Sequence, residues 1–427
     1  MTCSAAASPG CDPRGADRAV KTIDAEIDAL AEGAFALLER LVAEPSVVGQ
    51  EAGAQAVVAA ELERIGFAVE LLEVPQSIGA DPLGGVPQGS YAGRPLVVGR
   101  LAGGDGPSLL VNGHVDVVPA GWPELWTSPP FAPERRDGWL YGRGAGDMKS
   151  GFAMVLLAVE ALRRAAPAAL GGSLVFVSAI EEECTGNGTL ASIRAGVLGD
   201  AVLLPEPTGL DLLLGGAGVL WCDITVTGRA GHAHTADASA SPILACLALA
   251  AGLRTLEDEL NRDRPEDEAR CIVNVGTIEG GDWRSSAPVG ARLGVRVGFP
   301  PGWNADAAES AVRTAVAAAT AAPSWPPGLS ANVTFGGFRA VGYELDPGHA
   351  LVRMISDAHE SVHGTRPAPH RQATTTDARH YLNELALPAL CYGPRVRDIH
   401  GVDEAVELAS IVAGARTLTR FIPAFMT

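Results

Sequence analysis

The sequence contains few aromatic residues and lacks the cysteine spacing of a disulfide-stabilised protein. Aromatic residues account for 5% of its 427 residues, and its seven cysteines are odd in number, widely spaced and without a C-x-x-C pair. Small secreted scaffolds depend on an even set of closely spaced cysteines, so this class is not supported. The cysteine content instead favours the reducing environment of the cytoplasm.

Segments that direct a protein to or across a membrane are also missing. The opening MTCSAAASPGCDPRGADRAVKT has no basic start followed by an apolar run, so it does not match a secretory signal. We expect a disordered leader over residues 1–22. The apolar run PILACLALAAGL is too short to span a bilayer and predicts a buried helix. No membrane contact is therefore expected.

Positive charge is scarce. Lys and Arg number 32 against 50 Asp and Glu, and the formal net charge of -18 is spread through the sequence rather than gathered in a tail. An acidic surface repels the phosphates of nucleic acids and the head groups of anionic lipids. We therefore expect neither as a partner.

The length and the order of the apolar patterns predict two domains. A chain of 427 residues exceeds what one compact core usually holds. Before residue 215, helical spacing alternates with runs such as SLLVNGHVDVV and SLVFVSAI, which suit strands buried on both faces of a parallel or mixed sheet. Between about 216 and 339, strands and two helices form a unit with few polar clusters. We expect this unit to be an inserted domain, with residues 23–215 and 340–427 forming one catalytic domain.

Five polar clusters stand at or near the ends of apolar runs, where the active sites of open α/β sheets collect. In GHVDVVPAG, His114 and Asp116 are two residues apart on a strand and point to the same side. A carboxylate placed there can accept the far N–H of a metal-bound imidazole. The other clusters are Asp147 in GRGAGDMKSG, the acidic triplet 181–183 in SAIEEEC, Glu206 in LLPEP and His400 in RDIHGVDE. Asp147, taken alone, also suits a helix N-cap.

The residue types in these clusters predict a metal site. Three carboxylates in a row at the end of an apolar strand repel one another, and bound cations are the natural compensation. The clusters together offer two imidazoles and several carboxylates. This mixture suits zinc, cobalt or manganese better than calcium.

In order and local sequence, the clusters resemble those of the metallo-aminoacylase family. This family includes acetylornithine deacetylase, succinyl-diaminopimelate desuccinylase, aminoacylase, carnosinase-like dipeptidases and glutamate carboxypeptidase, and the similarity runs from about Asp24 to Phe421. It implies an α/β fold, namely a mixed-sheet metallohydrolase catalytic domain with an inserted α+β dimerisation (lid) domain. It also implies two divalent metal ions, zinc in the first place with cobalt or manganese as alternatives. The implied ligands are His114 and Glu206 for one ion, Glu183 and His400 for the other, and Asp147 between them, with Asp116 supporting His114.

The resemblance also implies the chemistry. A metal-activated water attacks a linear amide, with Glu182 as general base. The family order in the triplet is an acidic residue, the base and a ligand, which assigns Glu181, Glu182 and Glu183 in turn, although a register shifted by one stays open. The peptide bond after Asp147 should be cis.

The substrate follows from the same resemblance. We expect a deacylase of N-acyl amino acids, with a dipeptidase or carboxypeptidase as the alternative. A non-catalytic metal- or peptide-binding relative is disfavoured because the base, Glu182, is present.

The resemblance also implies which residues contact the substrate. His232 matches a histidine that the family delivers across a homodimer to the partner's active site. Arg296 in GVRVGF and Arg379 in TTTDARHY match arginines that hold a substrate carboxylate, for which a planar guanidinium is well suited. Ser285 in GGDWRSSAP stands where the family usually has Asn, and a threonine replaces the glycine before TDAR. Both departures concern substrate positioning rather than metal binding.

A competing motif is the H-E-x-x-H of zinc proteases, formed by His359, Glu360 and His363. The apolar stripe of this predicted helix leaves both histidines at its edge. The extended form of the motif fails, because Arg366 and Pro369 stand where Gly and His are needed. We therefore interpret the motif as part of a helix surface.

Overall fold

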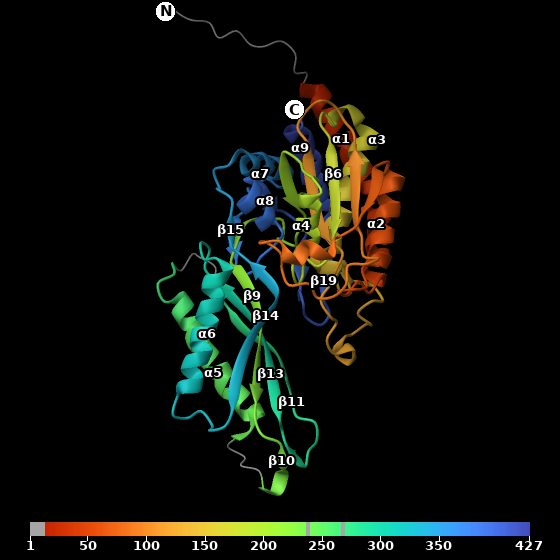
Figure 1. Ribbon diagram of the computed structural model, residues 1–427. Coiled ribbons are helices and arrows are strands. Elements are labelled where there is room, and N and C mark those ends of the chain that lie inside the picture. Colours follow the sequence, from red (N-terminus) through yellow and green to blue (C-terminus); the bar gives the residue numbers. More distant parts are fainter. Residues whose placement is uncertain (1–12, 236–239, 266–269) are drawn as a thin grey trace, which may run out of the picture.

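The computed structural model describes residues 13–235, 240–265 and 270–427 (Figure 1). Its larger part is a three-layer α/β sandwich around a mixed nine-stranded sheet. The strands are β1 (Ala68–Leu72), β2 (Leu96–Leu101), β3 (Leu109–His114), β6 (Leu174–Ala179), β7 (Ala201–Leu204), β8 (Leu212–Gly216), β15 (Tyr343–Glu344), β16 (Pro369–Gln372) and β17 (Ala389–Cys391).

Helices cover both faces of this sheet. One face packs against α1 (Pro13–Ala43), α2 (Ala52–Ile65), α3 (Ser150–Ala165), α7 (Ala350–His363) and α9 (Leu408–Phe425). The other face packs against α4 (Asn187–Arg194) and α8 (Ala378–Leu385). Alternate residues of a strand serve alternate faces: Leu109 and Val111 join the first core, and Leu110 joins the second.

The strand order is β1-β2-β6-β3-β7-β17-β8-β15, with β16 beside β8. Strand β3 runs parallel to both β6 and β7, and β17 runs parallel to β7. The carboxyl ends of these strands therefore meet at one edge of the sheet. Strand β17 comes from the last part of the chain, so both flanks of the predicted insertion build the same sheet.

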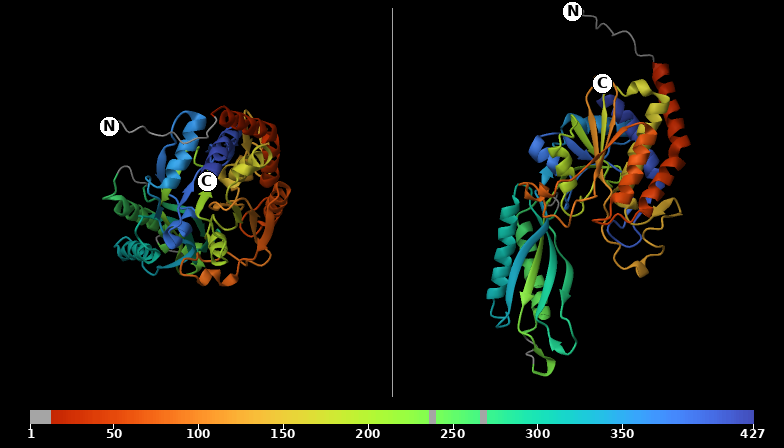
Figure 2. Two further views of the ribbon diagram at one scale, coloured as in Figure 1. Left: turned by 90° about the horizontal axis from the view of Figure 1, so that it is seen from above. Right: turned by 45° about the vertical axis from the view of Figure 1, so that its right-hand side comes forward.

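A second sheet lies apart from the first, and we call residues 218–340 that build it and its helices the lid. Strands β9 (Gly218–Thr227), β11 (Val273–Gly280), β13 (Gly290–Phe299) and β14 (Ser330–Ala340) pair antiparallel in the order β11-β13-β9-β14. Helices α5 (Pro242–Asn261) and α6 (Ala305–Ala321) cover one face and share a separate core with it. At the far end, β10 (Gly231–His232) pairs with β12 (Ser286–Ala287) and forms the lid tip (Figures 1 and 2).

A small sheet joins the two flanks a second time. It consists of β4 (Glu134–Arg136), β5 (Trp139–Tyr141), β18 (Val396–Arg397) and β19 (Ala405–Glu407) in the order β18-β19-β5-β4. Short helical turns connect the main elements: η1 (Gln76–Ala80), η2 (Pro123–Leu125), η3 (Ala145–Lys149), η4 (Pro167–Ala169) and η5 (Ala233–Thr235).

The predicted α/β class with a mixed sheet is confirmed, and two local expectations need correction. Residues 1–12 of the expected leader lie outside the described residues, but helix α1 already begins at Pro13 rather than after residue 22. Helix α5 is buried on one side only, since Leu244 and Leu247 are 53% and 57% exposed. None of the helices in the described ranges is both long and apolar enough to cross a bilayer.

Candidate metal centre

Three adjacent parallel strands deliver polar side chains to one edge of the main sheet. His114 is the last residue of β3, the acidic triplet follows β6, and Glu206 follows β7. The Nε2 atom of His114 lies 3.9 Å from Glu182 Oε2 and 4.0 Å from Glu206 Oε2. Glu182 and Glu206 are 68 and 92 positions from His114 in the chain. Each follows an apolar strand, and the parallel pairing of these strands with β3 brings the polar residues at their ends together.

Asp147 lies between the two predicted metal-binding histidines. Its Oδ1 is 3.5 Å from His114 Nε2, and its Oδ2 is 3.4 Å from His400 Nε2. The same His400 nitrogen is 3.0 Å from Glu183 Oε1. One carboxylate that faces a different imidazole with each oxygen has the geometry of a bridging ligand. The peptide bond between Asp147 and Met148 is cis, as the family resemblance implies.

The donor set fits divalent cations. Ligand atoms of His114, Asp147 and Glu183 lie within 4.8 Å of one another. Glu206 Oε1 is buried and has no hydrogen-bond partner in the described part of the chain, which is costly unless a cation compensates it. Burial, with repulsion from neighbouring carboxylates, raises the pKa of Glu206 to about 8. Such mutual destabilisation of anions is relieved by bound positive charge.

The same carboxylates also shift the pKa values of the two imidazoles. Burial by itself lowers the pKa of His114, but the surrounding carboxylates, Asp147 foremost, outweigh it and hold that pKa well above its usual value. Burial likewise opposes protonation of His400, while Glu183 and Asp147 raise its pKa to about 11. The carboxylates around both imidazoles therefore favour positive charge at this edge of the sheet.

The three acids of the triplet have different surroundings. Glu181, in a left-handed backbone conformation (φ 59°), turns away from the histidines and accepts hydrogen bonds from Arg94 (2.9 Å) and Tyr91 (2.7 Å). Glu182 points to the site, and its carboxylate accepts no hydrogen bond within the described residues. Burial raises the pKa of Glu182 well above its usual value. This arrangement favours the register in which Glu182 is the base and Glu183 the ligand.

Asp116 supports the site differently from the expectation. His114 Nδ1 is 2.9 Å from the backbone carbonyl of Asp116 and 3.6 Å from its carboxylate. That carboxylate instead accepts the backbone N–H groups of Glu182 (3.2 Å) and Glu183 (3.1 Å). Asp116 therefore fixes the loop that carries both acids, while its carbonyl orients the imidazole.

A second carboxylate, which the sequence reasoning missed, fixes the loops of Asp147 and His400. Glu404 is fully buried, and its Oε1 accepts the backbone N–H groups of Gly146 (2.8 Å) and Asp147 (2.9 Å). Its Oε2 forms a short ion pair with the buried Arg143, which also donates to the carbonyl of Gly401. The only available signal was the acid four residues after His400 in IHGVDE.

Lys149 is a further missed residue. It is fully buried, and its ammonium group donates to the carbonyls of Leu41 (2.7 Å) and Glu44 (3.0 Å), so the turn after Asp147 is tied to the end of α1. Burial lowers the pKa of Lys149 to about 7.

Arg379 lies inside the protein at the start of α8. It is 3% exposed and donates to the carbonyls of Thr376 (2.9 Å) and Thr185 (3.1 Å), with Asp377 at 3.2 Å. These contacts join the end of the acidic loop to α8. Its predicted contact with a substrate carboxylate stays a prediction.

The predicted lid residues are not near the metal centre of the same chain. His232 and Ser285 lie together at the lid tip, where β10 pairs with β12 and the N–H of Ala233 donates to the carbonyl of Ser285 (3.0 Å). His232 is exposed, at the end of the lid opposite the catalytic part (Figure 1). Arg296 lies nearer, on the open face of the lid sheet, and donates to the carbonyl of Ala373 (2.8 Å).

The competing H-E-x-x-H motif is on α7, as expected, but it is not a helix surface throughout. His359 is 6% exposed, its Nδ1 lies 2.9 Å from the hydroxyl of Tyr392, and His363 Nε2 lies 3.0 Å from that of Thr417. Glu360 points elsewhere and pairs with Arg366 (3.0 Å). The motif is thus a structural contact between α7, α9 and the end of β17.

The comparisons with known proteins agree with this geometry. The sequence profile of the peptidase family M20/M25/M40 matches residues 110–424, and the chain belongs to this family. It is 34% identical over 425 residues to the succinyl-diaminopimelate desuccinylase of Methylobacterium sp. (strain 4-46), covering 92% of this chain and 96% of that protein. The chain is therefore a metal-dependent hydrolase of amide bonds.

Solved structures show the same fold. The di-peptidase Dug1p from Saccharomyces cerevisiae superposes with a TM-score of 0.80 at 18% identity, over 95% of this chain and 98% of that one. A dinuclear metal-binding peptidase of family M20 from Bacillus subtilis superposes with a TM-score of 0.59 at 16% identity, over 93% and 99% of the two chains. At these identities the likeness concerns the fold alone.

Proposed function

We propose that the protein is a deacylase that hydrolyses the amide bond of N-acyl amino acids. The observation that carries this proposal is the 34% identity with a desuccinylase along almost the whole of both chains. A dipeptidase is the second candidate, because the dipeptidase Dug1p has the same fold. The complete set of acidic and imidazole side chains at the sheet edge supports an active enzyme in either case.

The proposed cofactors are two divalent metal ions, in the first place zinc. His114 and Glu206 would hold one, Glu183 and His400 the other, and Asp147 would contact both. When bound, the ions would lower the pKa of a water molecule and polarise the amide carbonyl. Cobalt or manganese suits the same donors.

Glu182 is the proposed general base. Its carboxylate lies beside His114 and is held by no hydrogen bond from the described residues, so it is available to take a proton from water and to pass it to the leaving amine. Asp116 keeps the backbone of this loop in place. Arg296 and Arg379 are the proposed partners of the substrate carboxylate, and Ser285 the proposed polar contact from the lid tip.

We further propose a homodimer formed by the inserted domain, residues 216–339. His232 is exposed and too far along the lid to serve its own chain without help, and a second subunit could supply it. The lid offers suitable surfaces: Leu244 and Leu247 form an exposed apolar stripe on α5, and Ile278 is 49% exposed on the edge strand β11. A two-fold contact would place both copies of His232 equivalently.

The proposed location is the cytoplasm. The five cysteines within the described residues are all buried and none of them forms a disulfide, as expected in a reducing compartment. The proposed partners are a small N-acyl amino acid or dipeptide and a second copy of the chain.

A substrate screen tests the proposed activity. N-acetyl, N-succinyl and N-formyl amino acids would be compared with dipeptides after the protein has been stripped of metal and reloaded with zinc, cobalt or manganese. We expect hydrolysis of an N-acyl amino acid only after reloading, at a higher kcat/KM than any dipeptide. Full activity of the stripped protein, or a preference for dipeptides, would contradict the proposal.

A further inference from the structure

We propose that residues 85–94, which we call the strap, couple the position of the lid to the orientation of the proposed base, with Tyr91 as a positioning residue. This inference rests on the proposed function, in which Glu182 takes the proton. The strap precedes β2 and contains no helix or strand of its own. Gly85, Tyr91 and Arg94 are buried, whereas residues 88–90 between them are exposed. The strap is therefore anchored in the protein near both of its ends.

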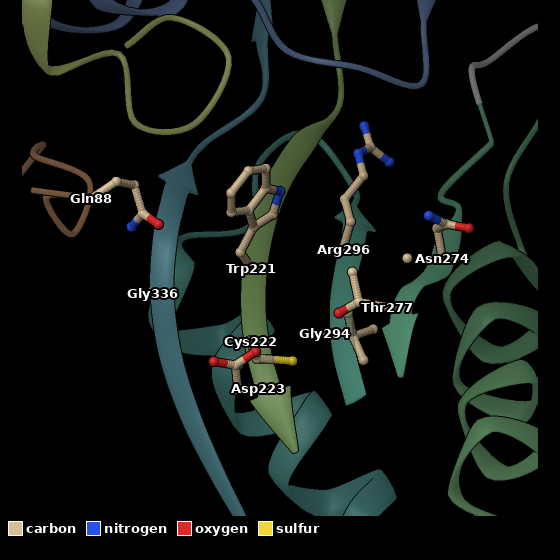
Figure 3. A pocket seen from close by; sticks show the side chains of 11 residues that line it. Gln88, Trp221, Cys222, Asp223, Asn274, Thr277, Gly294, Arg296 and Gly336 are labelled. Carbon is tan, nitrogen blue, oxygen red and sulfur yellow. The ribbon is translucent and has the colours of Figure 1, made fainter. Parts of the chain in front are cut away.

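The first end of the strap pairs with the lid. Val86 forms an antiparallel bridge with Gly337 of β14, and its N–H donates to the Gly337 carbonyl (2.9 Å). Gln88 lines the same cavity as Trp221 and Gly336 of the lid, and Figure 3 shows it beside β14. A backbone hydrogen bond thus joins the strap to the last strand of the lid.

The same end of the strap packs against the acidic loop, residues 181–186. A Cβ atom on Gly85 would lie 2.7 Å from Thr185 Cβ and 2.9 Å from the carbonyl of Gly337, so a larger residue does not fit between the lid and the loop. A Cβ atom on Gly337 would in turn lie 3.2 Å from the carbonyl of Cys184. Because the three segments are closely packed here, a shift of β14 has to displace the other two.

Asn187, which is fully buried at the start of α4, connects the two ends of the strap. Its side-chain oxygen accepts the N–H of Gly85 (2.9 Å), and its amide nitrogen donates to the carbonyl of Gly85 (3.0 Å). The same nitrogen donates to the hydroxyl of Tyr91 (2.8 Å). Both donors of the amide group are therefore used within the strap.

The second end of the strap holds Glu181, the residue before the proposed base. The hydroxyl groups of Tyr91 (2.7 Å) and Thr185 (2.9 Å) both donate to Glu181 Oε2. Arg94 donates to Oε1 (2.9 Å) and is itself fixed by two hydrogen bonds to Glu51. The Glu181 side chain is thus held by charge-assisted hydrogen bonds from two strap residues.

Glu181 needs this support because its backbone is left-handed. A φ of 59° is unfavourable for a residue with a side chain and persists only where the surroundings impose it. The carbonyl of Glu181 also accepts the N–H groups of Thr185 (3.0 Å) and Gly186 (2.7 Å), which closes the loop around Glu182 and Glu183. The direction of the Glu182 side chain therefore depends on the conformation that the strap imposes on Glu181.

These contacts form one continuous chain from the lid to the base. The lid has its own core and is joined to the catalytic part by two chain segments, near residues 217 and 341, so it can move as one body. When it closes over a substrate, the displacement of Gly337 reaches Glu181 through Gly85, Asn187 and Tyr91. Within the described ranges, Tyr91 forms no hydrogen bond to a proposed metal ligand. Its loss should therefore change kcat rather than KM or metal binding.

Tyr91→Phe tests the positioning role, because it removes one hydroxyl group and keeps the ring. We expect kcat on the substrate found in the screen to fall about 10- to 100-fold, as for a small misplacement of a reacting group. KM and the content of bound metal should change less than about twofold. Tyr392→Phe is the matched control: it removes an equally buried hydroxyl, bonded to His359 and Thr417, and should leave kcat unchanged. An unchanged kcat of Tyr91→Phe, or an equal fall in both variants, would overturn the role.

A double-mutant cycle tests the coupling to the lid. Val86→Pro removes the N–H that bonds to Gly337, and the following Pro87 already favours an extended conformation that proline can adopt. We expect Val86→Pro to lower kcat, and the double variant with Tyr91→Phe to be no more than about twofold slower than the slower single variant, because both changes break the same chain of contacts. Val86→Ala keeps the N–H and should retain kcat.

Two results of this cycle would contradict the coupling: full activity of Val86→Pro, or effects that multiply in the double variant. Failure of the wild-type protein to cleave any amide would instead overturn the proposed function itself.

Discussion

The catalytic part and the lid hold their functional residues in opposite ways. At the metal centre His114 is 1% exposed and Glu206 8% exposed, and the loops that carry the ligands are tied down by Asp116 and Glu404. In the lid, Ser285 is exposed and His232 lies on the exposed two-stranded sheet at the lid tip. Metal ligands must be preorganised to within fractions of an ångström, whereas groups that meet a substrate or a second subunit acquire their contacts only in the assembled state.

The largest expected effect on turnover comes from Glu182, the proposed base at the buried centre. Glu182→Gln should lower kcat about 10²- to 10⁴-fold, because the proton acceptor is lost while the ligands remain. Metal analysis should show near-normal occupancy, and Glu183→Gln should instead lose metal. If Glu182→Gln lost metal and Glu181→Gln lost only turnover, the register within the triplet would be shifted by one.

Subunit exchange tests whether the lid tip acts on a partner. His232→Ala and Glu182→Gln variants, each inactive alone, would be mixed under conditions that allow chains to exchange. Hybrid dimers should contain one complete site and restore activity far above either parent, measured as turnover per chain. Demonstrated exchange with activity at background would place the function of His232 outside the partner's site.

Stability should show the same contrast between the two regions. Arg94→Met removes the cation from the buried carboxylates of Glu51 and Glu181, and such a loss costs about 3–5 kcal/mol of unfolding free energy. Arg292→Met breaks an exposed pair on the lid sheet and should leave the unfolding curve unchanged. Denaturant titration of both variants measures the difference, and equal effects would contradict it.

The smallest expected effect concerns the buried histidine of α7. Burial, with repulsion from His363, lowers the pKa of His359 to about 4, whereas the unfolded value is near 6.5. The unfolded chain therefore binds a proton first, and stability present above pH 6.5 is lost as the pH falls toward 4. Protonation of His359 therefore lowers the free energy of unfolding by about 2 kcal/mol or less between pH 7.5 and pH 5.

His359→Gln removes this titration and keeps a group that can bond to Tyr392. The fall in melting temperature between pH 7.5 and 5 should be smaller in this variant than in the wild type. Glu360→Gln, on the exposed side of the same helix, serves as the control and should change neither stability nor turnover.

The sequence predicted that polar side chains gather where apolar strands end, and the signal for this is local. His114 is the last residue of an apolar strand and Glu206 follows another, and a buried parallel sheet brings such strand ends together. At the start of helix α6, the side chain of Asn304 accepts the N–H of Ala307 and caps the helix, a role for which Asn is a favoured residue type. The fold class followed from the alternation of these elements.

The supporting residues could not be predicted in this way. Arg94 and Glu404 lie in segments without periodicity, and their partners are 43 to 261 positions away, so only the tertiary structure reveals them. The reach of Asp116 to two backbone N–H groups depends on a loop conformation that a spacing rule does not contain.

The place of β17 in the main sheet has a consequence for biosynthesis. This strand, residues 389–391, lies between β7 and β8, and the proposed ligand His400 follows it. The lid, residues 218–340, leaves the ribosome earlier and has its own core, so it has the means to fold during translation. The central sheet cannot be completed until β17 has been synthesised, because β17 pairs with both β7 and β8. We therefore expect the nascent chain to expose these apolar strand edges longest, and chaperone binding during synthesis to be concentrated on them.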